Sequence, residues 1–334
     1  MIMCKDAENI KLYIDIVKKF KKIKIAVLGD FILDKYIWGT CSRISPEAPV
    51  PILESKSTEY RLGGAGNVAA NLSSLGCMVD TFGVIGNDNE GAILTNLLNK
   101  LEINSFLIES ITDRKTSLKT RVIADTQQIV RIDEETNKEI SIKETNVVIK
   151  QLLTNIEQYD ALIISDYLKG VITPRLTKKI ISSFRKRNKI VIVDPKGLNY
   201  NKYSGATAIT PNFNEFKLIN KQLNMKQETE ILGKYAMKLK NRLNLEGVII
   251  TLGSNGVYIQ NNNNKIIPTR AKEVFDVSGA GDTFIALFTA AFAVHINWFI
   301  AGEIANHGAG IIVGKTGTSI LKVHELINSL QENN

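Results

Sequence analysis

The sequence has few cysteines, no long apolar segment and no dense block of charge. Its 334 residues include three cysteines, Cys4, Cys41 and Cys77, which lie far apart and form no Cys-x-x-Cys pair. This pattern excludes a disulfide framework and a cysteine-based zinc site. Residues 4–9, Cys-Lys-Asp-Ala-Glu-Asn, are largely polar, and the N-terminus does not resemble a signal peptide. We therefore expect a reduced, cytoplasmic protein.

The longest apolar run extends from Phe284 to Val294, and the polar His295 and Asn297 follow it. A membrane-spanning helix needs about 20 apolar residues, so this run predicts a buried core helix and no membrane partner. The net charge is +8, from 42 Lys and Arg against 34 Asp and Glu. Because these lysines are scattered, we expect no nucleic-acid partner and attribute the excess to an anionic small molecule and a solvated surface.

What the sequence does have is an alternation of strand and helix patterns. Apolar runs typical of buried parallel strands occupy residues 23–28, 161–165, 190–193 and 247–251. Residues 89–101 and 145–156 show the spacing of amphipathic helices. This alternation predicts an α/β fold with a mostly parallel sheet covered by helices on both faces. We expect one large domain over residues 1–334.

Two segments interrupt the alternation. Residues 36–62 are rich in Pro, Ser and Thr, and residues 114–134 alternate polar and apolar around a turn near Asp125. The second pattern is typical of an antiparallel hairpin. We expect both segments to form a small β lid over the carboxyl edge of the sheet, where ligands bind in such folds.

The strongest motif is Asp276-Val277-Ser278-Gly279-Ala280-Gly281-Asp282-Thr283, directly before the apolar helix. Gly279, Ala280 and Gly281 allow a tight turn whose N–H groups bind an anion at a helix N-terminus. Asp282, placed beside a phosphoryl group, could take the proton from an attacking hydroxyl. The alternative is a plain turn followed by an acidic first helical turn.

Two other glycine patterns point to different functions. Residues 309–316 satisfy a loose phosphate-loop pattern, but the interior is apolar and a helix precedes it. Gly64–Ala69 matches G-x-G-x-x-A with Asp80 downstream, although a polar segment precedes it. An NAD-dependent oxidoreductase using Gly64–Ala69 is therefore the alternative function from another class.

Four motifs together resemble those of the ribokinase-like (PfkB) carbohydrate kinases: Gly29–Asp34, Gly63–Asn67, Asn212–Glu215 and Gly279–Asp282. The resemblance covers about residues 20–320. It implies a ribokinase-like three-layer α/β/α sandwich with a β lid, phosphoryl transfer from ATP with Mg²⁺, and a homodimer. Residues 42–51, 165–170, 194–197 and 313–318 are similar to the bacterial kinases of D-glycero-β-D-manno-heptose 7-phosphate.

These kinases phosphorylate the C1 hydroxyl in the synthesis of ADP-heptose, a precursor of the lipopolysaccharide core. In many bacteria they are fused to a nucleotidyltransferase with a His-x-Gly-His motif. His295, His307 and His324 form no such motif, so we expect the second activity on another protein. Another sugar or sugar-phosphate kinase of the same family is the nearest alternative.

The resemblance also implies residue roles. Asp282 would be the catalytic base, with the Gly279, Ala280 and Gly281 amides binding the phosphoryl group. The sugar would contact Asp34, Gly63, Gly64 and Asn67. The nucleotide would contact Asn212, Glu215, Lys196, Thr251, Gly253, Gly256 and Asn306, and Glu215 would organise Mg²⁺ through water.

A phosphate on the sugar requires cations, and the lid supplies several. The candidates for substrate binding outside the family motifs are Arg43, Lys119, Arg121, Arg131, Asp166 and Lys169. Each lid cation could instead be an exposed strand charge. Likewise, Asp34 could be a surface charge, Thr251–Gly256 a plain turn and Asn306 a surface asparagine.

Overall fold

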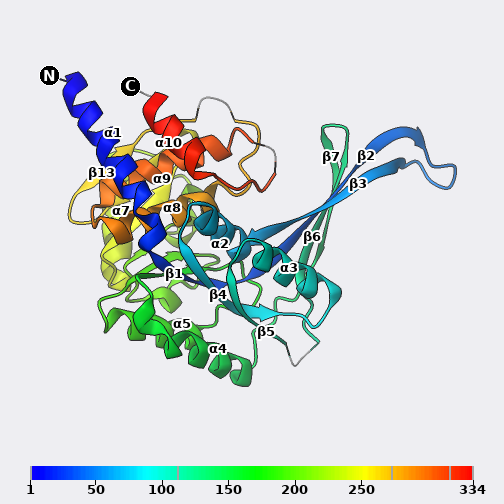
Figure 1. Ribbon diagram of the computed structural model, residues 1–334, viewed down its shortest axis with the longest axis horizontal. Helices are drawn as coiled ribbons and strands as arrows, with labels where there is room; N and C mark the ends of the chain where they lie inside the picture. The colour runs from blue at the N-terminus through cyan, green and yellow to red at the C-terminus, as the bar shows by residue number, and fades with distance from the viewer. Residues whose placement is uncertain (1, 111–112, 272–273, 316, 333–334) are drawn as a thin grey trace.

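The structure is a computed structural model that describes residues 2–110, 113–271, 274–315 and 317–332 (Figure 1). The main sheet has the strand order β13-β12-β11-β10-β9-β8-β1-β4-β5. The strands of this sheet are β1 (Lys24–Gly29), β4 (Met78–Ile85), β5 (Asn104–Glu109), β8 (Ala161–Ser165), β9 (Ile190–Asp194), β10 (Ala208–Ile209), β11 (Gly247–Thr251), β12 (Val257–Gln260) and β13 (Asn264–Ile267). Pairing is parallel from β5 to β11, and only β12 runs against its neighbours.

Helices cover both faces of this sheet. One face carries α1 (Ile2–Lys18), α2 (Ala65–Ser74), α3 (Asn89–Lys100), α8 (Ala280–Val294), α9 (Trp298–Ile312) and α10 (Val323–Glu332). The other carries α4 (Ile142–Thr154), α5 (Pro174–Arg185), α6 (Phe213–Ile219) and α7 (Thr229–Leu243). Short 3₁₀ turns lie at Phe20–Lys22, Ile156–Gln158, Tyr200–Tyr203 and Gly253–Asn255.

The period of two along β1 shows why its residues 25–28 are all apolar. Ile25 and Val27 pack into the core on the α8 side, whereas Ala26 and Leu28 pack into the core on the α5 side. A strand between two helical layers has no solvent face. The predicted three-layer α/β/α sandwich is therefore confirmed.

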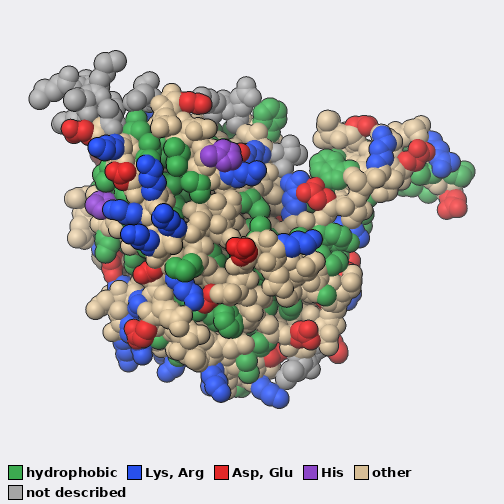
Figure 2. Space-filling model, in the orientation of Figure 1, with side chains coloured by type: hydrophobic (Ala, Val, Ile, Leu, Met, Phe, Trp, Pro, Cys, Tyr) green, Lys and Arg blue, Asp and Glu red, His purple; other side chains and the backbone are tan. Residues whose placement is uncertain are grey.

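A second sheet, which we call the arm, leaves the carboxyl edge of β1 and projects from the body (Figure 1; Figure 2). Its strand order is β3-β2-β6-β7. The strands are β2 (Phe31–Ile44), β3 (Pro51–Gly64), β6 (Ser117–Ala124) and β7 (Gln127–Glu134). The predicted hairpin around Asp125 is present as β6 and β7.

The arm is longer than the lid expected from residues 36–62, because β2 begins directly after β1. Asp34 therefore lies within an arm strand. The helix α1 and the strand β5 were not predicted. β5 is half-buried along most of its length and lies at the edge of the sheet, so it lacks the continuous apolar run of a central strand.

Candidate active site

The carboxyl ends of β8, β9, β10 and β11 converge with the start of α8 around one cavity of about 200 Å³. Seven of the predicted site residues line it: Lys196, Asn212, Glu215, Thr251, Gly279, Gly281 and Asp282. Tyr167, Asp194, Thr210, Val277 and Phe284 complete the lining. This arrangement brings the predicted base together with four of the seven predicted nucleotide residues.

The glycines before α8 give this cavity its shape. Gly279 caps the helix in a left-handed conformation, with φ of 80°. A Cβ atom at this position would lie 2.8 Å from Nδ2 of Asn67, so the close approach of α2 also requires glycine. Gly281 faces open space, since a Cβ atom added there would have no neighbouring atom within 4 Å. The first N–H groups of a helix lack intrahelical partners, which makes this end suitable for a phosphate.

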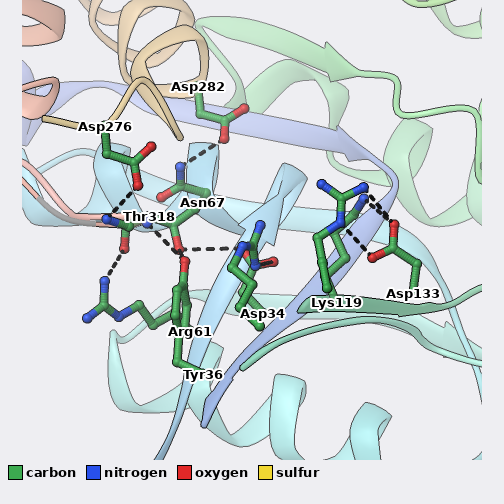
Figure 3. Close-up of polar contacts among 12 residues, drawn as sticks. Asp34, Tyr36, Arg61, Asn67, Lys119, Asp133, Asp276, Asp282 and Thr318 are labelled. Atoms are coloured by element: carbon green, nitrogen blue, oxygen red, sulfur yellow. Dashed lines mark hydrogen bonds and ion pairs between the residues drawn. The ribbon is translucent and has the colours of Figure 1, made fainter. Parts of the chain in front are cut away.

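Asp282 lies in the first turn of α8 and is 5% exposed. Its Oδ2 accepts a hydrogen bond from Nδ2 of Asn67 at 2.8 Å (Figure 3). Its Oδ1 accepts one from the hydroxyl of Tyr167 at 2.7 Å. Burial raises the pKa of Asp282 to about 6, although both hydrogen bonds oppose the shift. Above that pH, the side chain is an ionised carboxylate with a raised proton affinity, as a general base requires.

On the nucleotide side of the cavity, Asn212 and Glu215 form a capping box at the start of α6. Oε2 of Glu215 accepts from the N–H of Asn212 at 2.9 Å, and Oε1 pairs with Lys196. Burial lowers the pKa of Lys196, but Asp194 and Glu215 outweigh it and hold the pKa above its ordinary value. Lys196 is therefore a permanent cation beside Asp282.

Three predicted nucleotide residues lie outside the lining of this cavity. Gly256 has φ of 88°, and a Cβ there would lie 2.0 Å from the carbonyl oxygen of Ile267. Glycine at this position therefore allows β12 and β13 to approach each other closely. Gly253 also has a positive φ, in the 3₁₀ turn after β11. The Asn306 amide donates to the carbonyl of Pro268 at 2.6 Å. Their contact with a nucleotide stays a prediction.

The register of the arm places Asp34 and several of the predicted lid cations on one face. One row across the strands is Arg61, Asp34, Lys119 and Asp133, and the next is Glu59, Tyr36, Arg121 and Arg131. Partners in register point to the same face of a sheet. Three of the four predicted lid cations thus share a face with Asp34.

Asp34 is buried at the root of this face. Its Oδ1 accepts from Nη1 of Arg121 at 2.6 Å, and its Oδ2 faces the hydroxyl of Thr318 at 3.4 Å (Figure 3). A Cβ at Gly63 would lie 2.6 Å from Oδ2 of Asp34, so glycine leaves room for this carboxylate. The Arg121 guanidinium also stacks over the Tyr36 ring, 5.2 Å from its centroid.

The remaining predicted substrate residues are held by other partners. Arg43 is exposed in the outer part of the arm and lies 3.7 Å from Glu54. Lys169 pairs with Glu135 at 2.6 Å. Asp166 accepts from Lys202 and from the Tyr203 hydroxyl and does not line the cavity. These contacts do not involve Asp34, and a role of Arg43, Lys169 and Asp166 in substrate binding stays a prediction.

The dinucleotide-binding pattern at Gly64–Ala69 and the phosphate-loop pattern at residues 309–316 do not lie in the structural context that those motifs require. The strand before α2 is β3 of the arm, which is exposed or half-buried over residues 51–61, and Gly64 joins it to the helix with φ of 55°. The downstream Asp80 carboxylate is occupied by Lys24, Asn104 and Tyr159. Residues 309–312 are the last turn of α9, the opposite end from a phosphate-binding helix start; Thr316 lies outside the described residues.

Sequence reasoning missed Tyr167, Asp194 and Thr318 as site residues. Tyr167 and Asp194 each follow or end a buried parallel strand, which is a usable signal for the carboxyl edge. Thr318 reaches Asp34 from a segment 284 residues away, for which no local pattern exists.

Within the described ranges, no group of three His, Cys, Asp or Glu side chains is arranged to hold a metal ion. Both Glu215 oxygens are engaged, by Asn212 and Lys196. This donor set suits a magnesium ion that stays hydrated and is held by phosphates, since Mg²⁺ keeps several of its waters. In the same ranges, no helix is long and apolar enough to cross a membrane.

A family model described as pfkB family carbohydrate kinase matches residues 22–325. Among similar proteins is a bifunctional protein HldE of Sulfurimonas denitrificans, 45% identical over 305 residues, which are 91% of this chain and 63% of that protein. Another, from Aliarcobacter butzleri, is 42% identical over 318 residues, 94% of this chain and 66% of that protein. The chain therefore spans less than two thirds of the length of these relatives.

Solved structures resemble the fold. Phosphofructokinase-2 from Escherichia coli in complex with potassium superposes with a TM-score of 0.77 at 18% identity, covering 93% of this chain and 99% of that one. Ribokinase from Arabidopsis thaliana complexed with ribose and ATP gives a TM-score of 0.69 at 17% identity, covering 92% and 99%. Identities this low establish the ribokinase-like fold alone.

Proposed function

Because the chain belongs to the pfkB family of carbohydrate kinases, we propose that it phosphorylates the C1 hydroxyl of D-glycero-β-D-manno-heptose 7-phosphate. The product would be the 1,7-bisphosphate, an intermediate in the synthesis of ADP-heptose for lipopolysaccharide. The observation that carries the proposal is a single cavity joining Asp282 to Lys196 and Glu215, next to an arm face that gathers cations around Asp34.

The chemistry follows from Asp282. Its carboxylate takes the proton of the C1 hydroxyl as the oxygen bonds to the γ-phosphorus of ATP, and the bond from that phosphorus to the β–γ bridging oxygen breaks to release ADP. The N–H groups at the start of α8 and the ammonium of Lys196 stabilise negative charge on the transferring group. Mg²⁺, bound to the ATP phosphates, would neutralise further charge, and Glu215 would hold its water ligands.

The arm face supports a substrate that already carries a phosphate. Arg121 is bound to Asp34, while Lys119 and Arg131 both contact Asp133, at 3.5 Å and 2.9 Å. A phosphate dianion competes with these carboxylates for the cations, because charge-assisted hydrogen bonds from arginine to phosphate are strong. A neutral sugar offers no such exchange, so the site would reject it.

The opposite face of the arm supports a homodimer. Val130 and Ile132 are 45% and 50% exposed, and the register places Val122 beside Val130 and Ile37 beside Val122. An apolar stripe on a projecting sheet is stabilised when a second copy covers it. We expect Ile132→Asp to convert the dimer to a monomer in sedimentation velocity, and Lys56→Asp, on an exposed site of β3, to leave it unchanged.

The proposed substrate is tested by measuring ADP formation from ATP across a panel of sugars. The panel should contain heptose 7-phosphate, free heptose, ribose, fructose and fructose 1-phosphate. We expect kcat/KM for heptose 7-phosphate to exceed that for the unphosphorylated sugars by about 10⁴. Equal kcat/KM for ribose or fructose would overturn the substrate while leaving the family intact.

A further inference from the structure

The loop after β8, residues 166–171, is held by a buried carboxylate that has no role in the proposed chemistry. Asp30 is 1% exposed and lies just beyond β1. Its carboxylate accepts the backbone N–H groups of Tyr167 at 2.7 Å, Lys169 at 3.1 Å and Val171 at 3.1 Å. Three donors on one side chain fix the path of the loop.

The loop needs this clamp, because its backbone is strained. Leu168 has φ of +57°, a conformation that non-glycine residues rarely adopt. Gly170 has φ of +86°, and a Cβ there would lie 2.1 Å from the carbonyl oxygen of Lys138. Asp166, the first residue of the loop, accepts from the N–H of Leu168 at 2.8 Å and from the hydroxyl of Tyr203 at 2.6 Å. Strain that the surroundings maintain is typical of functional loops.

The consequence of this loop path is the direction of Tyr167. Its hydroxyl donates to Oδ1 of Asp282 at 2.7 Å, while Asn67 donates to Oδ2 at 2.8 Å. Each carboxylate oxygen has two lone pairs, so one on each oxygen stays available for the substrate. Burial and the neighbouring Asp282 raise the pKa of Tyr167 well above its ordinary value, so its phenol stays protonated and donates.

We propose that Tyr167 is a positioning residue for Asp282, and that Asp30 holds it in place through the strained 166–171 loop. Tyr167 fixes the direction of the carboxylate and favours its ionised form, since a donor to a charged acceptor stabilises the charge. This inference rests on the proposed role of Asp282 as the base.

Other charges around Asp282 set the background for this effect. Asp34, from the arm, raises the pKa of Asp282, and Lys196, from the loop after β9, lowers it. Asp194 lies near enough for Asp282 to raise its pKa in turn. None of these groups is altered when the Tyr167 hydroxyl is removed, so a change in the titration of Asp282 reports the loss of that one donor.

The chain contains a matched control. The hydroxyl of Tyr159, a buried residue, donates to Oδ2 of Asp80 at 2.7 Å, the same distance as in the Tyr167–Asp282 pair. Asp80 does not line the cavity. Tyr159→Phe therefore removes a buried Tyr–Asp hydrogen bond without touching Asp282.

The test is the pH dependence of kcat/KM for wild type, Tyr167→Phe and Tyr159→Phe, with any sugar that the wild type phosphorylates. We expect the acid limb of wild type near pH 6, and of Tyr167→Phe about one unit higher. The limb of Tyr159→Phe should coincide with wild type. Asp30→Asn, which weakens the clamp, should move the limb in the same direction as Tyr167→Phe. Coincidence of the Tyr167→Phe limb with wild type would overturn the proposal, and an unmoved limb in Asp30→Asn would overturn the role of the clamp.

A second readout separates this proposal from the proposed function. Carboxyl ¹³C NMR follows the titration of Asp282 without substrate, with its signal assigned by Asp282→Asn. A titration shifted upward in Tyr167→Phe supports the hydrogen bond even if heptose 7-phosphate is not the substrate. An unshifted titration contradicts the proposal even if the sugar panel succeeds.

Discussion

Two buried carboxylates in this molecule accept the same kinds of donor but lie in different regions. Asp282 accepts from an asparagine amide at 2.8 Å and a tyrosine hydroxyl at 2.7 Å. Asp80, on β4, accepts from an asparagine amide at 2.9 Å and a tyrosine hydroxyl at 2.7 Å. The difference is charge and space, because Asp80 also has the Lys24 ammonium at 2.9 Å, whereas Asp282 faces a cavity.

This comparison separates a structural carboxylate from a reactive one. Within the described ranges, Asp282 has no lysine or arginine at ion-pair distance, and burial raises its pKa to about 6. The negative charge of Asp80 is balanced by the ammonium group of Lys24. Hydrogen-bond partners alone therefore do not distinguish the two, and an unneutralised carboxylate at a cavity does.

The largest effect is expected from the carboxylates themselves. Asp282→Asn keeps the shape of the side chain but removes the base, so kcat should fall by about 10²–10⁴ with ATP affinity unchanged. Asp80→Asn is the matched control and should retain kcat near the wild-type value. Steady-state kinetics with a binding titration for ATP measures both. If Asp282→Asn keeps more than about a third of kcat, general-base catalysis by this residue is excluded.

Asp34 is an intermediate case. It is paired with Arg121, but a phosphate group on the substrate would compete for that cation. Arg121→Ala should raise KM for the sugar phosphate by tens to hundreds, since a charge-assisted hydrogen bond to phosphate contributes about 1.5–3 kcal/mol. ATP binding should not change. Lys56→Ala, which removes an exposed cation elsewhere on the arm, is the control. An unchanged KM in Arg121→Ala would move the phosphate site to other residues, such as Lys169 or Lys196.

The two carboxylates should also differ in their effect on stability. Asp80→Asn removes the partner of Lys24, whose side chain is 20% exposed, and should lower the thermal midpoint by several degrees. Asp282→Asn should raise the midpoint at pH 7.5, because wild type keeps an unneutralised buried charge there. Differential scanning calorimetry measures both. A large destabilisation by Asp282→Asn would make Asp282 a structural residue like Asp80.

The smallest effect is the pH dependence of that stability. The folded-state pKa of Asp282 is raised from 3.8 to about 6, so its stabilising contribution is complete below pH 4 and is lost as the pH rises through 6. The midpoints of wild type and Asp282→Asn should therefore diverge between pH 4 and 6, in favour of the variant. Parallel curves over that window would contradict the raised pKa.

Much of the body could be predicted from the sequence, because its central strands are buried on both faces and read as continuous apolar runs. The Asp282 motif could also be found, since its glycines and carboxylate are contiguous. The sequence alone could not show that Asp282 is the reactive carboxylate and Asp80 the structural one. The Lys24 cation beside Asp80 and the cavity beside Asp282 both depend on the order of the strands in the sheet. Tyr167 was missed for the same reason: its contact with Asp282 joins residues 115 positions apart.

The most direct test of the proposed reaction is phosphorus NMR of the product formed from heptose 7-phosphate and ATP. We expect one new phosphomonoester signal, coupled to the anomeric proton, together with the retained 7-phosphate signal and one equivalent of ADP. The product should resist a second round of phosphorylation. A new phosphate on any other carbon, or no phosphorylated sugar while ATP is turned over, would contradict phosphorylation at C1.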